Sequence, residues 1–293
     1  MFKPWVLLSL LSAFCLATSD ALTKRVITRE NEYVIAWLRL VAALPALWAA
    51  LWLAGPLPSP DAAFYGAFFA ALPLEIGAIL LYYRALRLSP ISLTLPFLAA
   101  SPVFLILFSF LIAGEAVSFA GGLGIALIGI GGYALNLSSL RTGILEPLRA
   151  ILRERGSVYM LIVALLYSVT SALGKVGVDH SSPAFFGATY VLAVVLVLIP
   201  VIVIRSGVRN VPSLIRRNLG TAALPALFDA VASVSYFYAL SMANVAYAIA
   251  VKRTSLLIGS VYGFLLFRER NVRYRLVGAM LLLAGFGVIA LFR

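Results

Sequence analysis

The sequence predicts an all-α integral membrane protein, with ten transmembrane helices arranged as two inverted five-helix repeats. Hydrophobic residues make up 63% of the 293 residues and charged residues only 12%, which leaves too little polar surface for a soluble domain. Apolar segments of about 20 residues, long enough to cross a hydrocarbon core of roughly 30 Å, recur along the whole chain. In lipid such a segment satisfies its own backbone groups only as a helix.

Each expected helix is one of these apolar segments. We expect helices at residues 5–22, 33–54, 62–86, 90–113, 118–137, 157–178, 183–204, 219–241, 244–267 and 275–292. No small-residue cleavage site follows the first segment, so we expect it to remain as a helix and not to be removed as a signal peptide. The segments between the helices are too short for a soluble domain.

The repeats are visible as matching residues at a fixed offset. Residues 82–115 match residues 236–269, so that Tyr82 pairs with Tyr236. Further pairs are residues 21–24 with 172–175, 37–42 with 188–193, Glu75 with Asp229, Glu115 with Glu269, Gly124 with Gly278 and Gly131 with Gly285. We therefore expect a first repeat at 1–140, a basic loop at 141–156 and a second repeat at 157–293. Five helices per copy make the second copy enter the membrane from the opposite face, an arrangement typical of carriers with a site between the halves.

The formal charge of +12 is explained by topology and needs no nucleic-acid partner. Seventeen of the 23 Lys and Arg residues follow odd-numbered helices, and Lys3, Lys175 and Arg293 lie on the opposite side. Because cytoplasmic loops collect Lys and Arg, both termini are expected outside a cell (inner) membrane. The single cysteine, Cys15, excludes an intrachain disulfide and a multi-cysteine metal site.

Two acidic residues lie near the centres of the third and eighth expected helices. Glu75 and Asp229 are repeat counterparts, and an unpaired charge there costs at least about 2.5 to 3.5 kcal/mol. Each has a tyrosine seven residues later on the same helical face, Tyr82 and Tyr236, and Ser233 lies between the second pair. We interpret the acids as coupling or gating residues and Tyr82, Tyr236 and Ser233 as substrate ligands.

Three cations complete the predicted site. Lys252 and Arg253 occupy the middle of the ninth expected helix, where the first copy has Leu98 and Ala99, and Lys175 ends the sixth. Clustered Lys and Arg donors suit a phosphate or carboxylate group. The alternative is charge balance, in which Lys252, Arg253 or Arg39 pairs statically with Glu75 and Asp229. Lys24, the counterpart of Lys175, follows Asp20 by four residues and is interpreted as an interfacial lysine.

Several other features have structural interpretations. The glycine-rich run at 121–132 lies inside an apolar helix and lacks the strand and acidic residue of a dinucleotide loop. Its glycines are expected to let the fifth and tenth helices pack closely. Pro90, Pro96 and Pro102 are expected to break or bend the fourth helix. His180 is expected to be a solvated residue in a short external loop.

The ends of the third and eighth helices, YYRAL at 82–86 and YFYAL at 236–240, and the acidic ends of the fourth and ninth, Glu115 and Glu269, carry a family resemblance. With the glycine-rich fifth and tenth helices, the chain resembles the drug/metabolite transporter superfamily, EamA-type, over almost its whole length. The resemblance implies ten helices in two repeats and a transport function, and it leaves the substrate open. Family members usually have cytoplasmic termini, whereas the charges here predict external ones. Lys252, Arg253 and Lys175 also resemble the phosphate-binding cations of triose-phosphate translocators.

The leading hypothesis is a secondary, alternating-access carrier of a small polar metabolite with an anionic group. No cofactor or metal is expected, and the sequence contains no Walker loop and no catalytic constellation, so we do not expect an enzyme. The alternatives are an exporter of amino acids or amphipathic compounds, and a lipid-binding or lipid-flipping protein or membrane enzyme that uses the same cleft. A monomer in contact with membrane lipid is sufficient for each of these functions, and a homodimer is the alternative.

Overall fold

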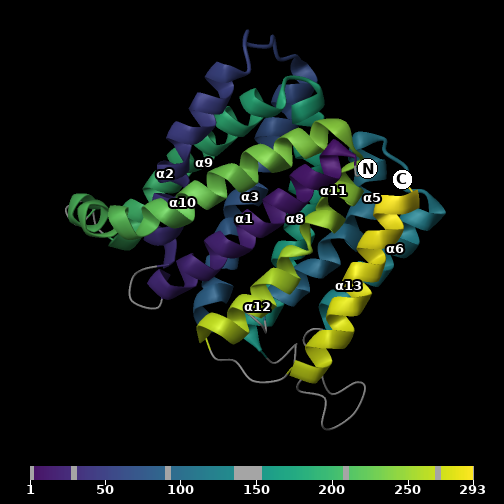
Figure 1. Cartoon of the computed structure of the whole chain (residues 1–293). Helices are drawn as coiled ribbons and strands as arrows, with labels where there is room; N and C mark the ends of the chain where they lie inside the picture. The colour runs from purple at the N-terminus through teal and green to yellow at the C-terminus, as the bar shows by residue number, and fades with distance from the viewer. Residues whose placement is uncertain are drawn as a thin grey trace.

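The computed structural model describes residues 3–27, 32–89, 94–134, 154–206, 211–267 and 272–292, and within these ranges every regular element is a helix (Figure 1). The helices of the first half are α1 (Pro4–Ile27), α2 (Glu32–Leu53), α3 (Ala62–Leu88), the 3-10 helix η1 (Leu95–Ala100), α5 (Ser101–Ala113) and α6 (Phe119–Ala134). Those of the second half are α8 (Arg155–Asp179), α9 (Pro183–Ser206), α10 (Val211–Met242), α11 (Val245–Lys252), α12 (Ser255–Phe267) and α13 (Val272–Phe292).

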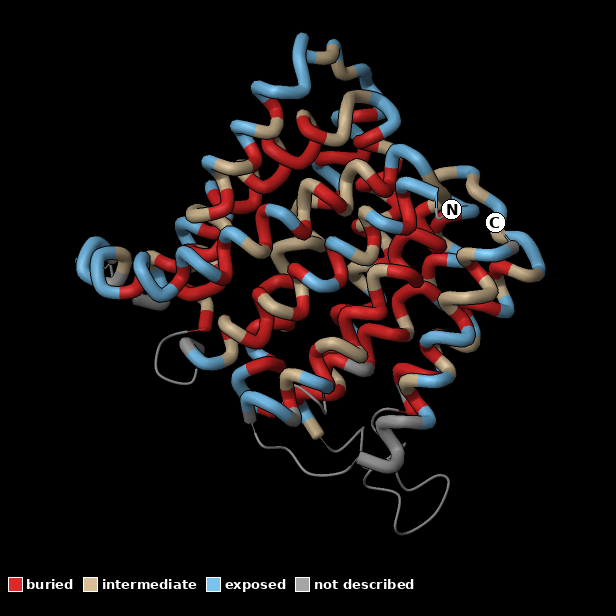
Figure 2. Tube along the Cα trace, viewed as in Figure 1, coloured by how far each residue is buried: buried red, intermediate tan, exposed pale blue. Residues whose placement is uncertain are grey.

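The helices fit a chain that crosses a membrane several times. Six of them are long and apolar enough to do so, namely α1, α2, α3, α8, α9 and α10, and shorter apolar helices lie at 97–113, 119–132 and 277–291. Large apolar side chains such as Trp52, Phe119 and Ile204 are exposed, where a soluble protein would carry polar groups. Figure 2 shows exposed positions along the outside of the bundle. The protein is therefore a multi-pass membrane protein, as the sequence predicts.

Each of the ten expected segments coincides with one helix or with two consecutive ones, and two of the segments are interrupted. The fourth starts with η1 and continues as α5, and Pro96 and Pro102 occupy the first turns of these two helices, in agreement with the predicted break. The third proline singled out, Pro90, lies outside the described residues. In the ninth segment, α11 ends at Lys252 and α12 starts at Ser255, although the sequence has no proline there.

The halves are packed against each other throughout the bundle. Helix α3 packs on α8, α1 on α10, α2 on α9 and α6 on α13. The last of these contacts is backbone to backbone, because a Cβ atom on Gly285 would lie 2.6 Å from the Gly124 carbonyl oxygen and one on Gly131 would lie 2.9 Å from that of Gly278. The glycines thus allow the close approach that the sequence predicts.

Candidate functional site

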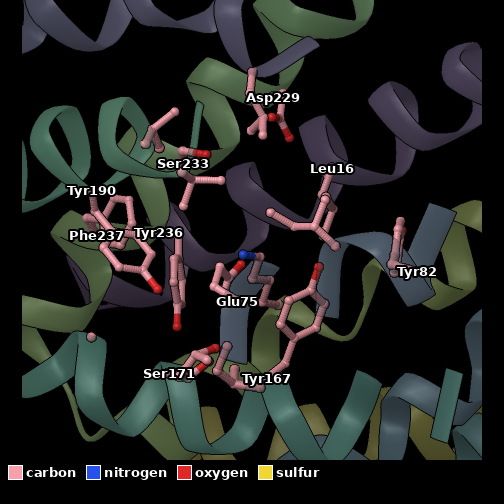
Figure 3. A pocket seen from close by; sticks show the side chains of 18 of the residues that line it. Leu16, Glu75, Tyr82, Tyr167, Ser171, Tyr190, Asp229, Ser233, Tyr236 and Phe237 are labelled. Carbon is pink, nitrogen blue, oxygen red and sulfur yellow. The ribbon is translucent and has the colours of Figure 1, made fainter. Parts of the chain in front are cut away.

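A cavity of about 210 Å³ lies between the halves, and residues of α1, α2, α3, η1, α8, α9, α10 and α11 line it (Figure 3). Its volume is below the 300–1,000 Å³ that is typical of sites for drug-sized ligands, so it suits a small metabolite. Seven of the eight residues predicted for the site line this cavity: Glu75, Tyr82, Asp229, Ser233, Tyr236, Lys252 and Arg253. Lys175 does not.

One wall of the cavity carries a buried ion-pair network centred on Arg39. Its guanidinium donates to Asp20 at 2.9 Å through Nη1 and to Asp229 at 2.7 Å through Nη2. The Tyr82 hydroxyl donates to the other oxygen of Asp20 at 2.5 Å. The side chains of Arg39, Asp20 and Asp229 are at most 11% exposed. Asp229 therefore forms an ion pair with Arg39, one of the partners that the charge-balance alternative named.

Asp20 is the member of this network that sequence reasoning missed. Its spacing from Lys24 indicates an intrahelical pair, but no ion pair joins the two in the described structure. Lys24 instead donates to the carbonyl oxygens of Leu86 and Ser89, at the end of α3. The signal available in the sequence was an acidic residue, Asp20, and an arginine, Arg39, within neighbouring apolar segments. Their contact becomes evident only once α1 and α2 are packed.

Lys252 and Arg253 lie at the interruption between α11 and α12. Lys252 is in the last turn of α11 and Arg253 is its C-cap, a place where the partial negative charge of the helix end favours cations. The Lys252 ammonium lies 3.8 Å from the centroid of the Tyr236 ring, a cation–π contact. The Arg253 guanidinium donates to the Ser101 hydroxyl oxygen through Nε at 2.9 Å and Nη2 at 2.7 Å.

Neither of these cations has a carboxylate partner. Among the described residues, no carboxylate oxygen lies within 4.0 Å of the Lys252 or Arg253 nitrogens. Glu75 also lines the cavity, and it makes no ion pair at this distance with any described cation. The cavity thus holds one ion-paired network around Arg39 and, apart from it, two cations and one carboxylate that form no ion pair within 4.0 Å in the described part of the chain.

The structure places Lys175 away from the other two predicted cations. Its ammonium donates to the Leu240 carbonyl oxygen at 3.0 Å and to Asp179 at 2.8 Å, and it lies 3.7 Å from Glu115. Leu240 is in the last turn of α10, and its repeat counterpart Leu86 accepts from Lys24 in the same way. Both lysines therefore satisfy carbonyl groups that a helix leaves unpaired at its C-terminal end. The sequence prediction that Lys175 shares a site with Lys252 and Arg253 is not met by this geometry.

Polar contacts outside the spans connect the loops at the same end of the bundle as Lys175. The Glu115 carboxylate accepts from the Val245 backbone N–H at 2.8 Å, and burial raises the pKa of Glu115 while this bond and Lys175 oppose the rise. His180 is exposed, as expected, and contacts Asp61 at 2.7 Å. These contacts join the loop after α5 to the start of α11, and the loop after α2 to the loop after α8.

Comparisons with known proteins agree with this architecture. A model of the EamA-like transporter family matches residues 3–137 and residues 154–291. No curated protein matches the chain. One solved structure, described only as "Crystal structure of protein", aligns with 99% of this chain and 95% of its own chain at 16% identity and a TM-score of 0.68, which shows a shared fold. With one match in each half and nearly all residues covered, the chain belongs to the EamA-like transporter family.

Proposed function

We propose that this membrane transporter is a secondary carrier for a small organic anion, whose anionic group binds Lys252 and Arg253 in the cavity between the halves. The observation that supports this most directly is the absence, among the described residues, of a carboxylate within 4.0 Å of either cation. A buried charge without a partner is costly, and a ligand carboxylate or phosphate would supply the partner. Arg253 offers a planar fork and Lys252 a point charge to such a group.

The packing of the halves supports an inverted repeat with ten membrane-crossing segments. Exchanging each helix for its repeat counterpart turns the contact of α3 with α8 into that of α10 with α1, and the contact of α5 with α8 into that of α12 with α1. The contacts of α2 with α9 and of α6 with α13 map onto themselves. A pseudo-twofold arrangement of this kind lets a carrier alternate between two states, open to opposite sides of the membrane and related by the pseudo-twofold axis, around one central site. The proposed orientation, with both termini outside the cell membrane, follows from the positions of the arginines and lysines.

Proton coupling is assigned to Glu75 alone. Asp229 is held by Arg39, whereas Glu75 lines the cavity without an ion-pair partner within 4.0 Å. The charged groups in and beside the cavity are Asp20, Glu75, Asp229, Arg39, Lys252 and Arg253, whose formal charges cancel. An incoming anion makes this set negative, and a proton taken up by Glu75 restores neutrality before the site is enclosed in the membrane.

The experiment that tests the anion site compares single and double variants at Arg253 and Glu75. Binding of small carboxylates and phosphate esters to the purified protein is measured by calorimetry, with neutral amide analogues as controls. We expect Arg253→Leu to remove anion binding, and Arg253→Leu with Glu75→Gln to fold well but still to bind no anion. Under charge balance the second substitution removes the lone buried charge, and full recovery of anion binding in the double variant would contradict the proposal.

A further inference from the structure

We infer that the cavity contains a second subsite, formed by Glu75, Tyr190 and Tyr236, that binds a hydrogen-bond-donating substituent of the transported anion. The inference rests on the proposed function, because Lys252 and Arg253 are taken to hold the anionic group. It adds the chemical class of the substrate: an organic acid or phosphate ester with a hydroxyl or ammonium group close to its anionic group.

The repeat relates this subsite to the network around Arg39. At the offsets that align the two copies, the four members of that network have the following counterparts: Asp20 pairs with Ser171, Arg39 with Tyr190, Tyr82 with Tyr236 and Asp229 with Glu75. Three of the four counterparts keep a polar side chain of similar reach, but the guanidinium is replaced by a phenol. The second set therefore lacks the group that joins the members of the first.

In the first set the Arg39 guanidinium donates hydrogen bonds to both carboxylates. Arg39 binds Asp20 and Asp229 at 2.9 and 2.7 Å, and Tyr82 binds Asp20 at 2.5 Å. These three distances are those of charge-assisted hydrogen bonds. The first set is thus an ion-paired network in which Arg39 bonds both carboxylates, although its Nε has no hydrogen-bond partner among the described residues.

In the second set no cation joins the members, and Ser171 and Thr170 are the polar neighbours of Tyr236 and Glu75. Among the described residues, the hydroxyl groups of Tyr190 and Tyr236 have no hydrogen-bond partner, and Tyr190 is only 7% exposed. In the described part of the chain, no Lys or Arg nitrogen lies within 4.0 Å of the Glu75 carboxylate. Figure 3 shows Glu75, Tyr190 and Tyr236 on the same side of the cavity, with the Tyr236 hydroxyl directed toward Ser171. Buried polar groups without partners are rare in native proteins, and a cavity is where a ligand can provide them.

The chemistry of these groups defines what the ligand must offer. An ionised carboxylate such as that of Glu75 only accepts hydrogen bonds, so the bound group needs an O–H or N–H. Tyrosine hydroxyls can donate to or accept from the same group. Tyr236 belongs to both subsites, since its ring lies under the Lys252 ammonium and its hydroxyl belongs to the unsatisfied set. The donor substituent of the ligand therefore lies within a few bonds of the anionic group.

The test uses three acids of nearly equal size: propionate, lactate and alanine carry a hydrogen, a hydroxyl and an ammonium group at the same carbon. Binding to the purified full-length protein is measured by calorimetry. We expect lactate or alanine to bind at least about tenfold more tightly than propionate, the effect of one hydrogen bond to a charged group. A preference for alanine identifies an ammonium ligand and a preference for lactate a hydroxyl ligand.

The variants Tyr190→Phe and Glu75→Gln should reduce this preference to less than about threefold while propionate still binds. Tyr238→Phe is the matched control, because Tyr238 is two residues from Tyr236 and does not line the cavity. Equal binding of the three acids, or a preference that both variants retain, would overturn the inference and leave the anion site standing. If none of the three binds, or if propionate binding survives Arg253→Leu, the proposed anion site fails and the inference fails with it.

Discussion

The first half of the chain crosses the middle of the bundle through η1 and α5, and the second half through α11 and α12. The helix that follows each break starts at the same repeat position, Ser101 in one half and Ser255 in the other. The residues before the break differ, because Leu98 and Ala99 correspond to Lys252 and Arg253. The position of the break is thus shared by the copies, whereas the charge at the break belongs to one copy only.

The same division holds at the acidic positions. Asp229 forms an ion pair with Arg39. Its counterpart Glu75 has Tyr190 at the position that corresponds to Arg39, and it forms no ion pair within 4.0 Å with any described residue. One side of the cavity therefore holds an ion-paired network, and under the proposed function the other side binds the ligand. Substitutions at counterpart positions can separate these two roles.

The largest difference is expected between Asp229→Asn and Glu75→Gln. Removing the Asp229 charge leaves Arg39 half paired in a buried site, which typically costs about 3–5 kcal/mol. Glu75→Gln removes a charge that is not ion-paired, so stability should change little while pH-driven uptake is lost and exchange continues. Unfolding in detergent and proteoliposome uptake with and without a pH gradient measure the two effects. Equal loss of stability in the two variants would contradict the assignment of roles.

Tyr82→Phe and Tyr236→Phe form the next pair. The Tyr82 hydroxyl donates to Asp20 at 2.5 Å, and a hydrogen bond to a charged group contributes about 1.5–3 kcal/mol. The Tyr236 hydroxyl has no partner in the described structure, so its removal should leave the free energy of unfolding of the ligand-free protein unchanged. Thermal unfolding of both variants checks this. A Tyr236→Phe protein as unstable as the Tyr82→Phe protein would show that both hydroxyls are structural.

Much of this arrangement could be predicted from the sequence, and the failures have a common cause. The repeat paired Glu75 with Asp229, and the apolar segments predicted the helices. Both predictions rest on the order of residues along the chain and need no knowledge of how the helices pack. The contacts of Lys175 and Asp20 depend on which carbonyl or cation a neighbouring helix brings to them. The interruption at Arg253 has no proline to indicate it, and its hydrogen bonds to Ser101 join opposite halves.

Ser101→Ala and Ser255→Ala test this contact between the halves. Ser101 fixes two of the guanidinium nitrogens of Arg253, so Ser101→Ala should weaken anion binding about tenfold, and Ser101→Thr should restore it. Ser255, at the counterpart position, should give no change. In the Arg253→Leu background Ser101→Ala should have no further effect on binding. An effect there would mean that Ser101 acts on the site independently of Arg253.

The smallest effect concerns the starts of α1 and α8, which are repeat counterparts. Glu154 caps α8 by accepting from the Ser157 backbone N–H at 2.6 Å, whereas the counterpart residue before α1, Lys3, has no side-chain acceptor. Burial raises the pKa of Glu154, but hydrogen bonds from Ser157, Ser89 and Gly156 lower it below its ordinary value of 4.5. The stabilisation is therefore complete above pH 4.5 and is lost as the pH falls further. Glu154→Ala should cost about 1 kcal/mol at neutral pH, and an unchanged unfolding curve would argue against the cap.

The glycine contact between α6 and α13 has a mechanical consequence. Side chains that interlock must change rotamer when two helices turn against each other. At this seam Gly124 and Gly285 bring the backbones together, and the side chains of Ile128 and Ile289 pack against these glycines. This seam maps onto itself under the repeat and lies along one edge of the bundle in Figure 1, and none of the described residues of α6 or α13 lines the cavity. Under the proposed alternating access, the halves would turn about this seam, and the glycines have no side chain that must change rotamer during the turn. A methyl group at Gly285 would then stall the rotation without touching the substrate.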